Sequence, residues 1–255
     1  LDQLATRLAG LHEKYEEHFT IRTAEPQFQA EQQSVDSPPS QSNNQAADAA
    51  SSNDITIRFD TSLCIHSQQC VLNAPKVFLS NVEGPWLHPK EVTIEHLVRT
   101  AQLCPSGAIT STRLDGGDDE CAPPVNVLQT RENGPYAFRA DLYIKGQDCR
   151  YRASLCRCGK SNNKPFCDNT HRKIGFVATG EPETLPFEPL QLRSGELQVS
   201  PVKNGPLHVR GPIEICSGTG RTVMCTQNVK LCRCGASANK PFCDNSHVLI
   251  KFRSE

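Results

Sequence analysis

Two nearly identical stretches of the chain each carry three cysteines and one histidine in the same order. LCRCGKSNNKPFCDNTH begins at Leu155 and LCRCGASANKPFCDNSH begins at Leu231. In both, eight residues separate a Cys-x-Cys pair from a Cys-x3-His pair. The candidate ligands are Cys156, Cys158, Cys167 and His171 in the first copy and Cys232, Cys234, Cys243 and His247 in the second. Thiolates and an imidazole at this close, repeated spacing predict two metal sites.

Residue chemistry alone leaves the metal in these sites open. Three thiolates and one imidazole close a tetrahedral structural zinc site well. Cys167 and His171 are four residues apart, which predicts that both lie on one face of a helix that starts after Pro165. The free amide groups at that helix start would favour a negatively charged metal complex.

The same residues resemble the CDGSH iron–sulfur signature of the NEET family. Residues 168–171 and 244–247 read Asp-Asn-Thr-His and Asp-Asn-Ser-His where that signature has Asp-Gly-Ser-His. The resemblance covers residues 134–255 and implies one 2Fe–2S cluster for each motif, held by its three cysteines and its histidine. Tandem copies imply a β-rich domain with pseudo-twofold symmetry. Asn replaces Gly in both motifs, and we expect the turn to form because Asn tolerates left-handed backbone.

A third group of cysteines lies earlier in the chain. In CIHSQQC, cysteines fill the first and third positions of a C-x2-C-x2-C ferredoxin run, serine fills the second, and a Cys-Pro pair follows later. These residues are Cys64, Ser67, Cys70 and Cys104. Three thiolates predict a 3Fe–4S cluster, or a 4Fe–4S cluster whose fourth ligand is Ser67, His66 or water. Ordinary buried cysteines stay open as the alternative. Residues 55–114 also resemble the divergent single-cluster ferredoxin domain that accompanies CDGSH motifs in some bacterial proteins.

Hydrophobic patterning and composition divide the chain into seven segments. Residues 1–27 contain an amphipathic helical pattern, and residues 28–54 are polar enough to predict a disordered linker. We expect a ferredoxin-like domain over 55–114, a connector over 115–133, a first CDGSH-type repeat over 134–180, a connector over 181–203 and a second repeat over 204–255. The fold class predicted is α+β, with small irregular domains: a ferredoxin-like α/β domain precedes a pseudo-twofold, NEET-type β-rich domain with two cluster-binding loops.

Local patterns predict the elements that position the cysteines. The alternation in ITIRF indicates a strand from Ile55, and KVFLSNVEGPWLHP contains a hairpin signal. Pro89 is expected to open a helix that leads to Cys104. Alternating apolar residues near Phe138 and Leu207 predict a half-buried strand at the start of each repeat.

Composition limits the binding partners and the cellular compartment that we expect for the protein. The 255 residues carry a formal net charge of −1, so no basic field points to nucleic acid or to an anionic membrane. No apolar run is long enough to span a bilayer. The thirteen cysteines are an odd number and closely spaced, which favours metal binding in a reducing compartment. We expect the bacterial cytoplasm, with the mitochondrial matrix as the alternative.

The start of the chain also carries an expectation. Leu1 is the first residue and Met224 is the only methionine, so we expect a processed form or part of a longer polypeptide. The helix predicted over residues 1–22 has no core of its own. It would therefore pack on the rest of the chain, on an upstream domain or on another subunit.

The expected function is electron transfer by a multi-cluster iron–sulfur protein, with a reductase or an electron acceptor as the partner. The alternatives are redox sensing or cluster transfer to an apo iron–sulfur acceptor, and a redox tail of an upstream enzyme. No catalytic triad, phosphate loop or paired carboxylates are recognisable, so an enzyme is not expected. Cys149 and Cys225 suggest core residues or a redox pair, and Lys164 and Lys240 suggest solvated surface lysines or charge compensation for a cluster.

Overall fold

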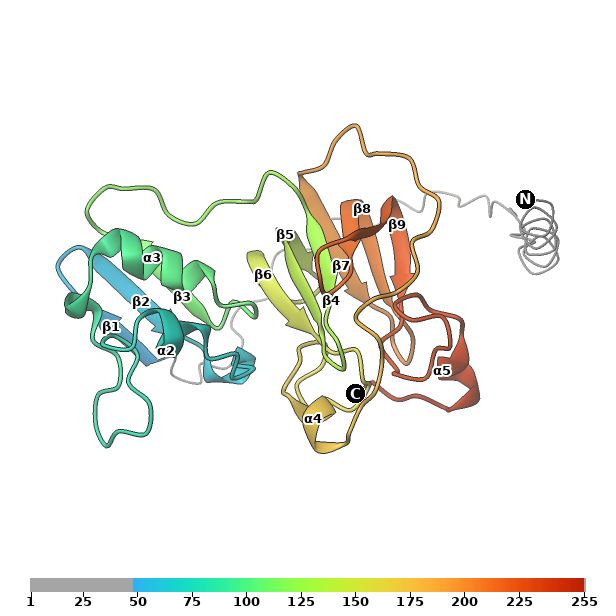
Figure 1. Ribbon diagram of the computed structural model, residues 1–255, viewed down its shortest axis with the longest axis horizontal. Coiled ribbons are helices and arrows are strands. Elements are labelled where there is room, and N and C mark those ends of the chain that lie inside the picture. The colour runs from blue at the N-terminus through green and yellow to red at the C-terminus, as the bar shows by residue number, and fades with distance from the viewer. Residues whose placement is uncertain (1–47, 255) are drawn as a thin grey trace, which may run out of the picture. The chain divides into compact units, whose positions relative to one another are not determined.

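The computed structural model describes residues 48–254 (Figure 1). The helix predicted within 1–27, and linker residues 28–47, lie outside the described residues. In the described range the chain is α+β with few, short helices, and it contains a three-stranded sheet and a six-stranded sheet.

The first sheet has the strand order β1-β2-β3, with β1 at Asp48–Ser51, β2 at Ile55–Phe59 and β3 at Ile109–Arg113. Both pairings are antiparallel, and Ile57 of β2 is fully buried opposite Ser111. The strand predicted at Ile55 is confirmed. The linker prediction is wrong over 48–51, because these small and polar residues gain their strand conformation from hydrogen bonds to β2 and not from a hydrophobic pattern.

The helices of this domain are shorter than expected. The helix predicted from Pro89 is only a 3-10 turn, η2 at Pro89–Glu91, and the helix α3 begins later, at Ile94–Gln102. Thr93 is extended and its side chain accepts a hydrogen bond from the His96 amide at 3.3 Å, which is an N-cap that starts α3 there. The predicted hairpin is reduced to one bridge between Phe78 and Leu87. Two further short elements are η1 at Thr61–Leu63 and α2 at Gln69–Asn73.

The second sheet exchanges strands between the two repeats. Its strands are β4 Val127–Thr130, β5 Tyr136–Ile144, β6 Arg150–Leu155, β7 Glu196–Pro201, β8 Leu207–Cys216 and β9 Thr222–Leu231. Hairpin β5–β6 and hairpin β8–β9 are antiparallel. β4 pairs antiparallel with β5 and parallel with β8, whereas β7 pairs antiparallel with β8 and parallel with β5. The segments predicted as connectors, 115–133 and 181–203, therefore each contribute a strand.

The core of this sheet follows the predicted alternation. Along β5 the side chains of Phe138, Leu142 and Ile144 are buried, and along β8 those of Val209 and Ile215 are buried. The half-buried strand predicted for each repeat is thus confirmed. Because β5 and β8 each lie beside both β4 and β7, the two repeats share one hydrophobic core and are not separate domains.

Asn126 fastens the crossing point of the exchanged strands. Its side chain is fully buried and donates hydrogen bonds to the carbonyl oxygens of Gly195 and Pro212, at 2.8 and 2.9 Å. Its Oδ1 accepts a hydrogen bond from the Asp141 amide at 3.1 Å. The amide group therefore joins segments from both repeats, and it has no apolar substitute.

Replacing Asn126 with leucine should lower the free energy of unfolding by about 3 kcal/mol, because two carbonyls and one amide would stay buried without partners. Denaturant unfolding followed by circular dichroism measures this loss. Asn228→Leu is the matched control at an exposed position of β9. Equal stability of the two variants would show that Asn126 does not fasten the repeats.

Candidate metal centre

The four predicted ligands of each motif come together as two pairs. In the first motif the Sγ atoms of Cys156 and Cys158 are 3.8 Å apart, and Sγ of Cys167 is 3.4 Å from Nδ1 of His171. The corresponding distances in the second motif are 3.7 and 3.4 Å. Two sulfurs on one metal with bonds of about 2.3 Å and tetrahedral angles lie about 3.8 Å apart. Each pair is therefore spaced to hold one metal ion, and among residues 48–254 no third such side chain joins a pair.

Backbone hydrogen bonds clamp each ligand loop to the end of a strand. After β6, the Cys156 amide donates to the Pro165 carbonyl at 2.8 Å, and the Cys167 amide donates to the Ser154 carbonyl at 2.9 Å. After β9, the Cys232 and Cys243 amides make the same bonds to the Pro241 and Lys230 carbonyls, both at 2.9 Å. The chain thus turns back on itself, which brings the third cysteine to the first two.

The helix predicted to carry Cys167 and His171 is a single turn. α4 spans Thr170–Lys173 and α5 spans Ser246–Leu249, so the histidines lie in these turns while the cysteines precede them. The predicted shared helix face is therefore wrong. Asn169 and Asn245 have φ values of 67° and 68°, which confirms the left-handed turn expected where the signature has glycine. This turn directs each histidine back toward its cysteine.

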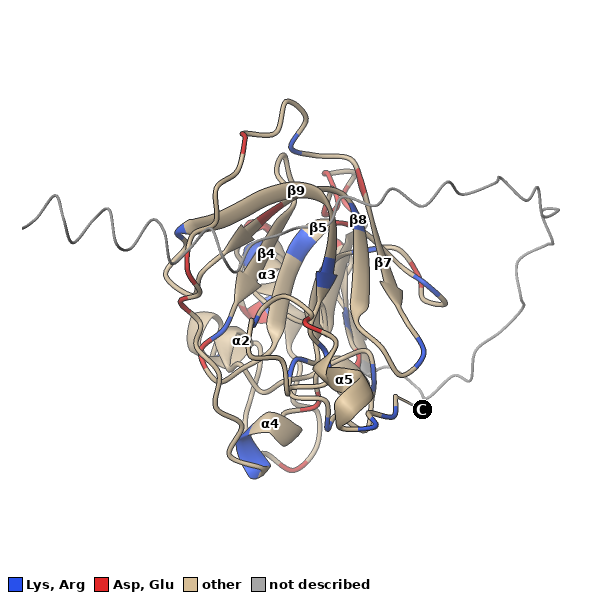
Figure 2. Ribbon diagram, turned by 90° about the vertical axis from the view of Figure 1, so that its right-hand side faces the viewer, with Lys and Arg blue, Asp and Glu red and all other residues tan. Residues whose placement is uncertain are grey.

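The surroundings of the two turns differ. Arg172 and Lys173 follow the first histidine, and Val248 and Leu249 follow the second. The ribbon of α4 is partly blue in Figure 2, which marks Lys and Arg. α5 contains no Lys, Arg, Asp or Glu. Val248 and Leu249 are 65% and 84% exposed. The second motif therefore presents an apolar surface beside its histidine.

Burial and hydrogen bonding make the ligand thiols unequal. A hydrogen bond with Cys158 lowers the pKa of Cys156 to about 6, and a bond with Cys234 lowers the pKa of Cys232 to about 6. Burial raises the pKa of Cys167 to about 11. One thiol of each loop therefore ionises readily, and the others need a metal ion to displace the proton. Burial lowers the pKa of His171, which favours the neutral imidazole that binds metal.

Two buried arginines inside the Cys-x-Cys pairs were not foreseen from the sequence. Arg157 is 1% exposed and donates to the carbonyls of Ala178 and Thr179, at 2.6 and 3.0 Å. Arg233 is 3% exposed and donates to the Gly205 carbonyl at 3.0 Å, and also to a second carbonyl. Each loop thus buries a hydrogen-bonded cation that offsets negative thiolates. The sequence did contain a signal for these arginines, since the arginine of CRCG is the same in both copies.

The two ligand loops meet back to back. Gly159 and Gly235 have φ values of 79° and 83°. A Cβ atom on Gly159 would lie 2.4 Å from the Cys234 carbonyl oxygen, and one on Gly235 would lie 2.6 Å from that of Cys158. Glycine is therefore required at both positions by backbone conformation and by contact. Tyr136, fully buried, adds hydrogen bonds from its hydroxyl to two carbonyls of the second loop.

The lysines and the non-ligand cysteines considered in the sequence analysis have clear positions. Lys164 and Lys240 are half-buried, and their Nζ atoms donate to carbonyls of their own loops at 2.6 and 2.5 Å, so neither is a solvated surface lysine. Cys149 is exposed, which contradicts the prediction of a core residue, and Cys225 is half-buried. Every cysteine is free of disulfide bonds.

The third ligand group is assembled around α2 and the end of α3. Cys64 and Cys70 are half-buried, and Cys104 is 7% exposed. Burial raises the pKa of Cys70, and the neighbouring thiols of Cys104 and Cys64 raise it further. The His66 amide donates to Sγ of Cys64 at 3.4 Å. The three predicted thiols are thus near enough to interact electrostatically, but within residues 48–254 no three such side chains are close enough to hold one metal ion, and their assignment to one cluster stays a prediction.

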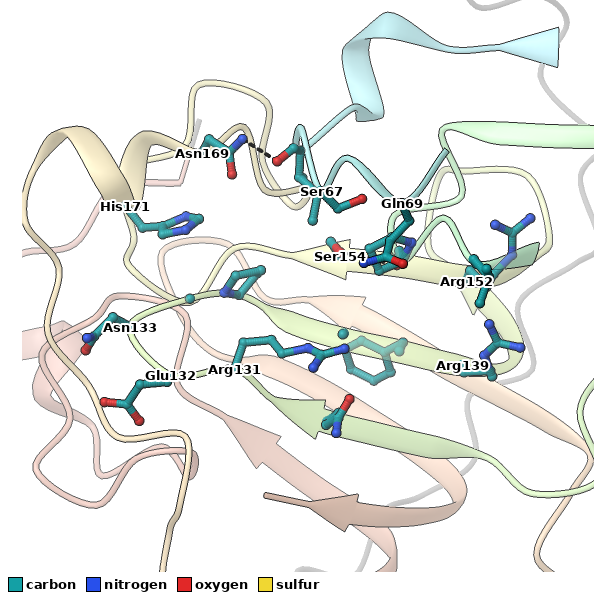
Figure 3. Close-up of a pocket in the computed structure, with 18 of the residues that line it drawn as sticks. Ser67, Gln69, Arg131, Glu132, Asn133, Arg139, Arg152, Ser154, Asn169 and His171 are labelled. Atoms are coloured by element: carbon teal, nitrogen blue, oxygen red, sulfur yellow. Dashed lines mark hydrogen bonds between the residues drawn. The ribbon is translucent and has the colours of Figure 1, made fainter. Parts of the chain in front are cut away.

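The two candidates for a fourth ligand have different surroundings. Nδ1 of His66 is 4.0 Å from Sγ of Cys64, so its ring lies beside a ligand thiol. Ser67 borders a cavity of about 870 Å³ instead. Figure 3 shows that His171 of the first motif borders the same cavity. The third ligand group and the first motif are therefore neighbours.

Comparison with known proteins matches these sites to two families. A model of the iron-binding zinc finger of CDGSH type matches residues 133–172 and 204–248. A model of a divergent 4Fe–4S mono-cluster domain matches residues 50–113. The chain is also similar to the uncharacterized protein YjdI of Escherichia coli K12, with 38% identity over 55 residues, which is 22% of this chain and 71% of that protein. YjdI of Escherichia coli O157:H7 gives the same values. Within residues 48–254, no helix has the length and apolar character needed to cross a bilayer.

Alanine at Gly159 should cost about 2 kcal/mol more than alanine at Gly146, because only the first would press on a backbone carbonyl of the other loop. Both glycines have positive φ, and Gly146 has open space around it, so the backbone strain is shared. Thermal unfolding and bound metal per chain measure the difference, and metal should be lost from both motifs. If the two variants behave alike, the loops do not depend on this contact.

Proposed function

Since this chain belongs to the CDGSH iron–sulfur family and carries a divergent 4Fe–4S mono-cluster domain before its two motifs, we propose that it is a multi-cluster electron carrier. The pairwise spacing of the ligands carries this proposal. A 2Fe–2S cluster would take two protein ligands at each iron, and the spacing of the thiols and the imidazole in two pairs supports such a cluster. A single zinc ion would need all four ligands around one centre.

The residues present fit a 2Fe–2S cluster at each motif. Cys156 and Cys158 would hold one iron of the first cluster, and Cys167 and His171 the other. The corresponding set in the second motif is Cys232 and Cys234, then Cys243 and His247. A bound cluster supplies a one-electron ferric–ferrous couple, and the buried arginines and amide groups of the loops offset its negative charge. The reciprocal pairing of β4 and β7 supports a pseudo-twofold relation of the motifs.

In the first domain, Cys64, Cys70 and Cys104 would hold a 4Fe–4S or a 3Fe–4S cluster. The match to a 4Fe–4S mono-cluster domain favours four irons. His66 is then the favoured fourth ligand, since its ring lies beside Cys64, and Ser67 or water is the alternative.

Electron transfer suits the rest of the molecule. A reductase would give one electron to the chain and an acceptor protein would take it from the chain, and no bond of the chain would form or break. Such exchange requires closely spaced centres and no substrate pocket. The bacterial relatives support the bacterial cytoplasm as the setting, and the comparisons give the mitochondrial matrix no support.

A second candidate function, transfer of a cluster to an apo-acceptor, is favoured by one observation. Cys243 and His247 are half-buried, whereas Cys167 and His171 are only 3% and 8% exposed. The second motif is therefore the more accessible donor. A redox tail of an upstream enzyme stays a further proposal, and the segment expected to contact such a domain, 1–22, lies outside the described residues.

The anaerobically purified chain should contain acid-labile sulfide together with iron, with EPR signals from more than one type of cluster after reduction. Metal and sulfide assays, combined with EPR before and after dithionite, measure this. Zinc without sulfide in both motifs would overturn the proposal. Loss of visible absorbance on addition of an apo-ferredoxin, with a matching gain by the acceptor, would favour cluster transfer over electron transfer.

Replacing His171 or His247 with cysteine should lower the reduction potential of the affected cluster. A thiolate adds a negative charge where the imidazole is neutral, and this disfavours uptake of an electron. Anaerobic spectroelectrochemical titration measures the potential. His208→Cys is the control, because His208 is not one of the predicted ligands and its ring bonds to Asn228. An unchanged potential in both ligand variants would contradict the assignment of the histidines.

A further inference from the structure

One arginine of the first repeat donates three hydrogen bonds to the first domain. Arg152, on β6, is 3% exposed. Its Nη1 donates to the carbonyls of Ala101 and Cys104, at 2.6 and 2.7 Å, and its Nη2 donates to the Ile109 carbonyl at 3.1 Å. These carbonyls belong to the end of α3, to the predicted ligand Cys104 and to the start of β3.

Glu120 completes the set of partners around Arg152. Nε and Nη2 of the arginine donate to its two carboxylate oxygens, at 2.7 and 2.6 Å. A guanidinium has five N–H donors, and all five are therefore used. A buried charge with a bidentate carboxylate and three carbonyl acceptors is a fixed joint and not a chance surface contact.

The backbones on either side of this joint are in close contact. Ser154 Oγ donates to the Pro105 carbonyl at 3.2 Å. A Cβ atom on Gly107 would lie 2.7 Å from the Arg152 carbonyl oxygen. The Cys104-Pro105 segment is thus held against β6, with no room for a side chain at Gly107.

The ligand loops themselves are also joined. The side-chain amide of Asn169, two residues after Cys167, donates to the Ile65 carbonyl at 2.5 Å (Figure 3). Asn163 of the same loop donates to the Ser62 carbonyl at 2.8 Å. Ile65 directly follows Cys64, so this contact connects the third ligand group to the first motif.

The second repeat lacks this joint. The repeats align from Cys149 with Cys225, so Asn228 stands where the first has Arg152, and Lys230 stands where it has Ser154. Asn228 is exposed and its Oδ1 bonds to Nε2 of His208, within its own sheet. The second loop retains the equivalents of Asn163 and Asn169, but both are exposed. The two motifs have identical predicted ligands, but the strand residues Arg152 and Ser154 give the first motif contacts that Asn228 and Lys230 do not give the second.

We propose that the first repeat alone is a built-in docking site for the first domain, with Arg152 as the positioning residue that fixes the Cys104 segment. The third ligand group and the first motif then form one rigid pair, and the second motif keeps its accessible face for an external partner. The inference rests on the proposed function only for the nature of the metal centres. The joint itself is made of protein groups.

The test exchanges the residues of the two repeats in the full chain. Arg152→Asn should speed amide hydrogen exchange in residues 101–109 by about tenfold or more, because charge-assisted hydrogen bonds are lost, and Asn228→Arg should not. Exchange along β8 serves as the internal control. Ser154→Ala, which removes only the hydrogen bond to the Pro105 carbonyl, is the milder variant should Arg152→Asn fail to fold, and it should speed exchange in the same residues.

A second readout concerns the pairing of the centres. In the dithionite-reduced chain, magnetic interaction between the first-domain centre and a motif centre should broaden the EPR signals, and Arg152→Asn should remove that broadening while Asn228→Arg leaves it. Unchanged exchange over 101–109 in both Arg152→Asn and Ser154→Ala would overturn the docking proposal even if all clusters are present. Absence of acid-labile sulfide would overturn the proposed function, and the exchange experiment would still decide the docking.

Discussion

The close approach of Gly159 and Gly235 is the constraint on which both motifs depend. Each glycine lies against the backbone of a predicted cysteine ligand in the other loop, so a side chain at either glycine would displace the other loop. The strand exchange supplies that condition, because β4 and β7 each pair with strands of both repeats. The duplication therefore produces one structural unit with two coupled sites, and not two independent metal-binding modules.

The loop contact also explains why cations are buried between the cysteines. Several thiolates close to one another in a dry interior repel, and an unpaired charge there would be costly. Arg157 and Arg233 are held by backbone carbonyls, so neither guanidinium depends on a hydrogen bond to a carboxylate to stay buried at its loop. The two guanidinium groups thus place positive charge in the loops, which would favour binding of a negatively charged complex.

Sequence reasoning succeeded where the determinants are local. The left-handed turns at Asn169 and Asn245 and the alternation along β5 and β8 are determined by adjacent residues, whereas the ligand sets stay a prediction. It failed for β1, β4 and β7, which are short strands whose pairing is decided by distant segments. It also failed for Arg152, because an arginine in an alternating strand is indistinguishable from a surface residue until its acceptors are known.

The two motifs show how identical ligands acquire different environments. The predicted ligands are the same in both copies of the motif. The two copies differ in the residues that surround those ligands. The first motif has a buried histidine, basic residues after it and a neighbouring domain joined through Arg152 and Asn169. The second has a more accessible histidine followed by exposed Val248 and Leu249. The duplication therefore leaves the predicted ligands of the first motif more enclosed than those of the second.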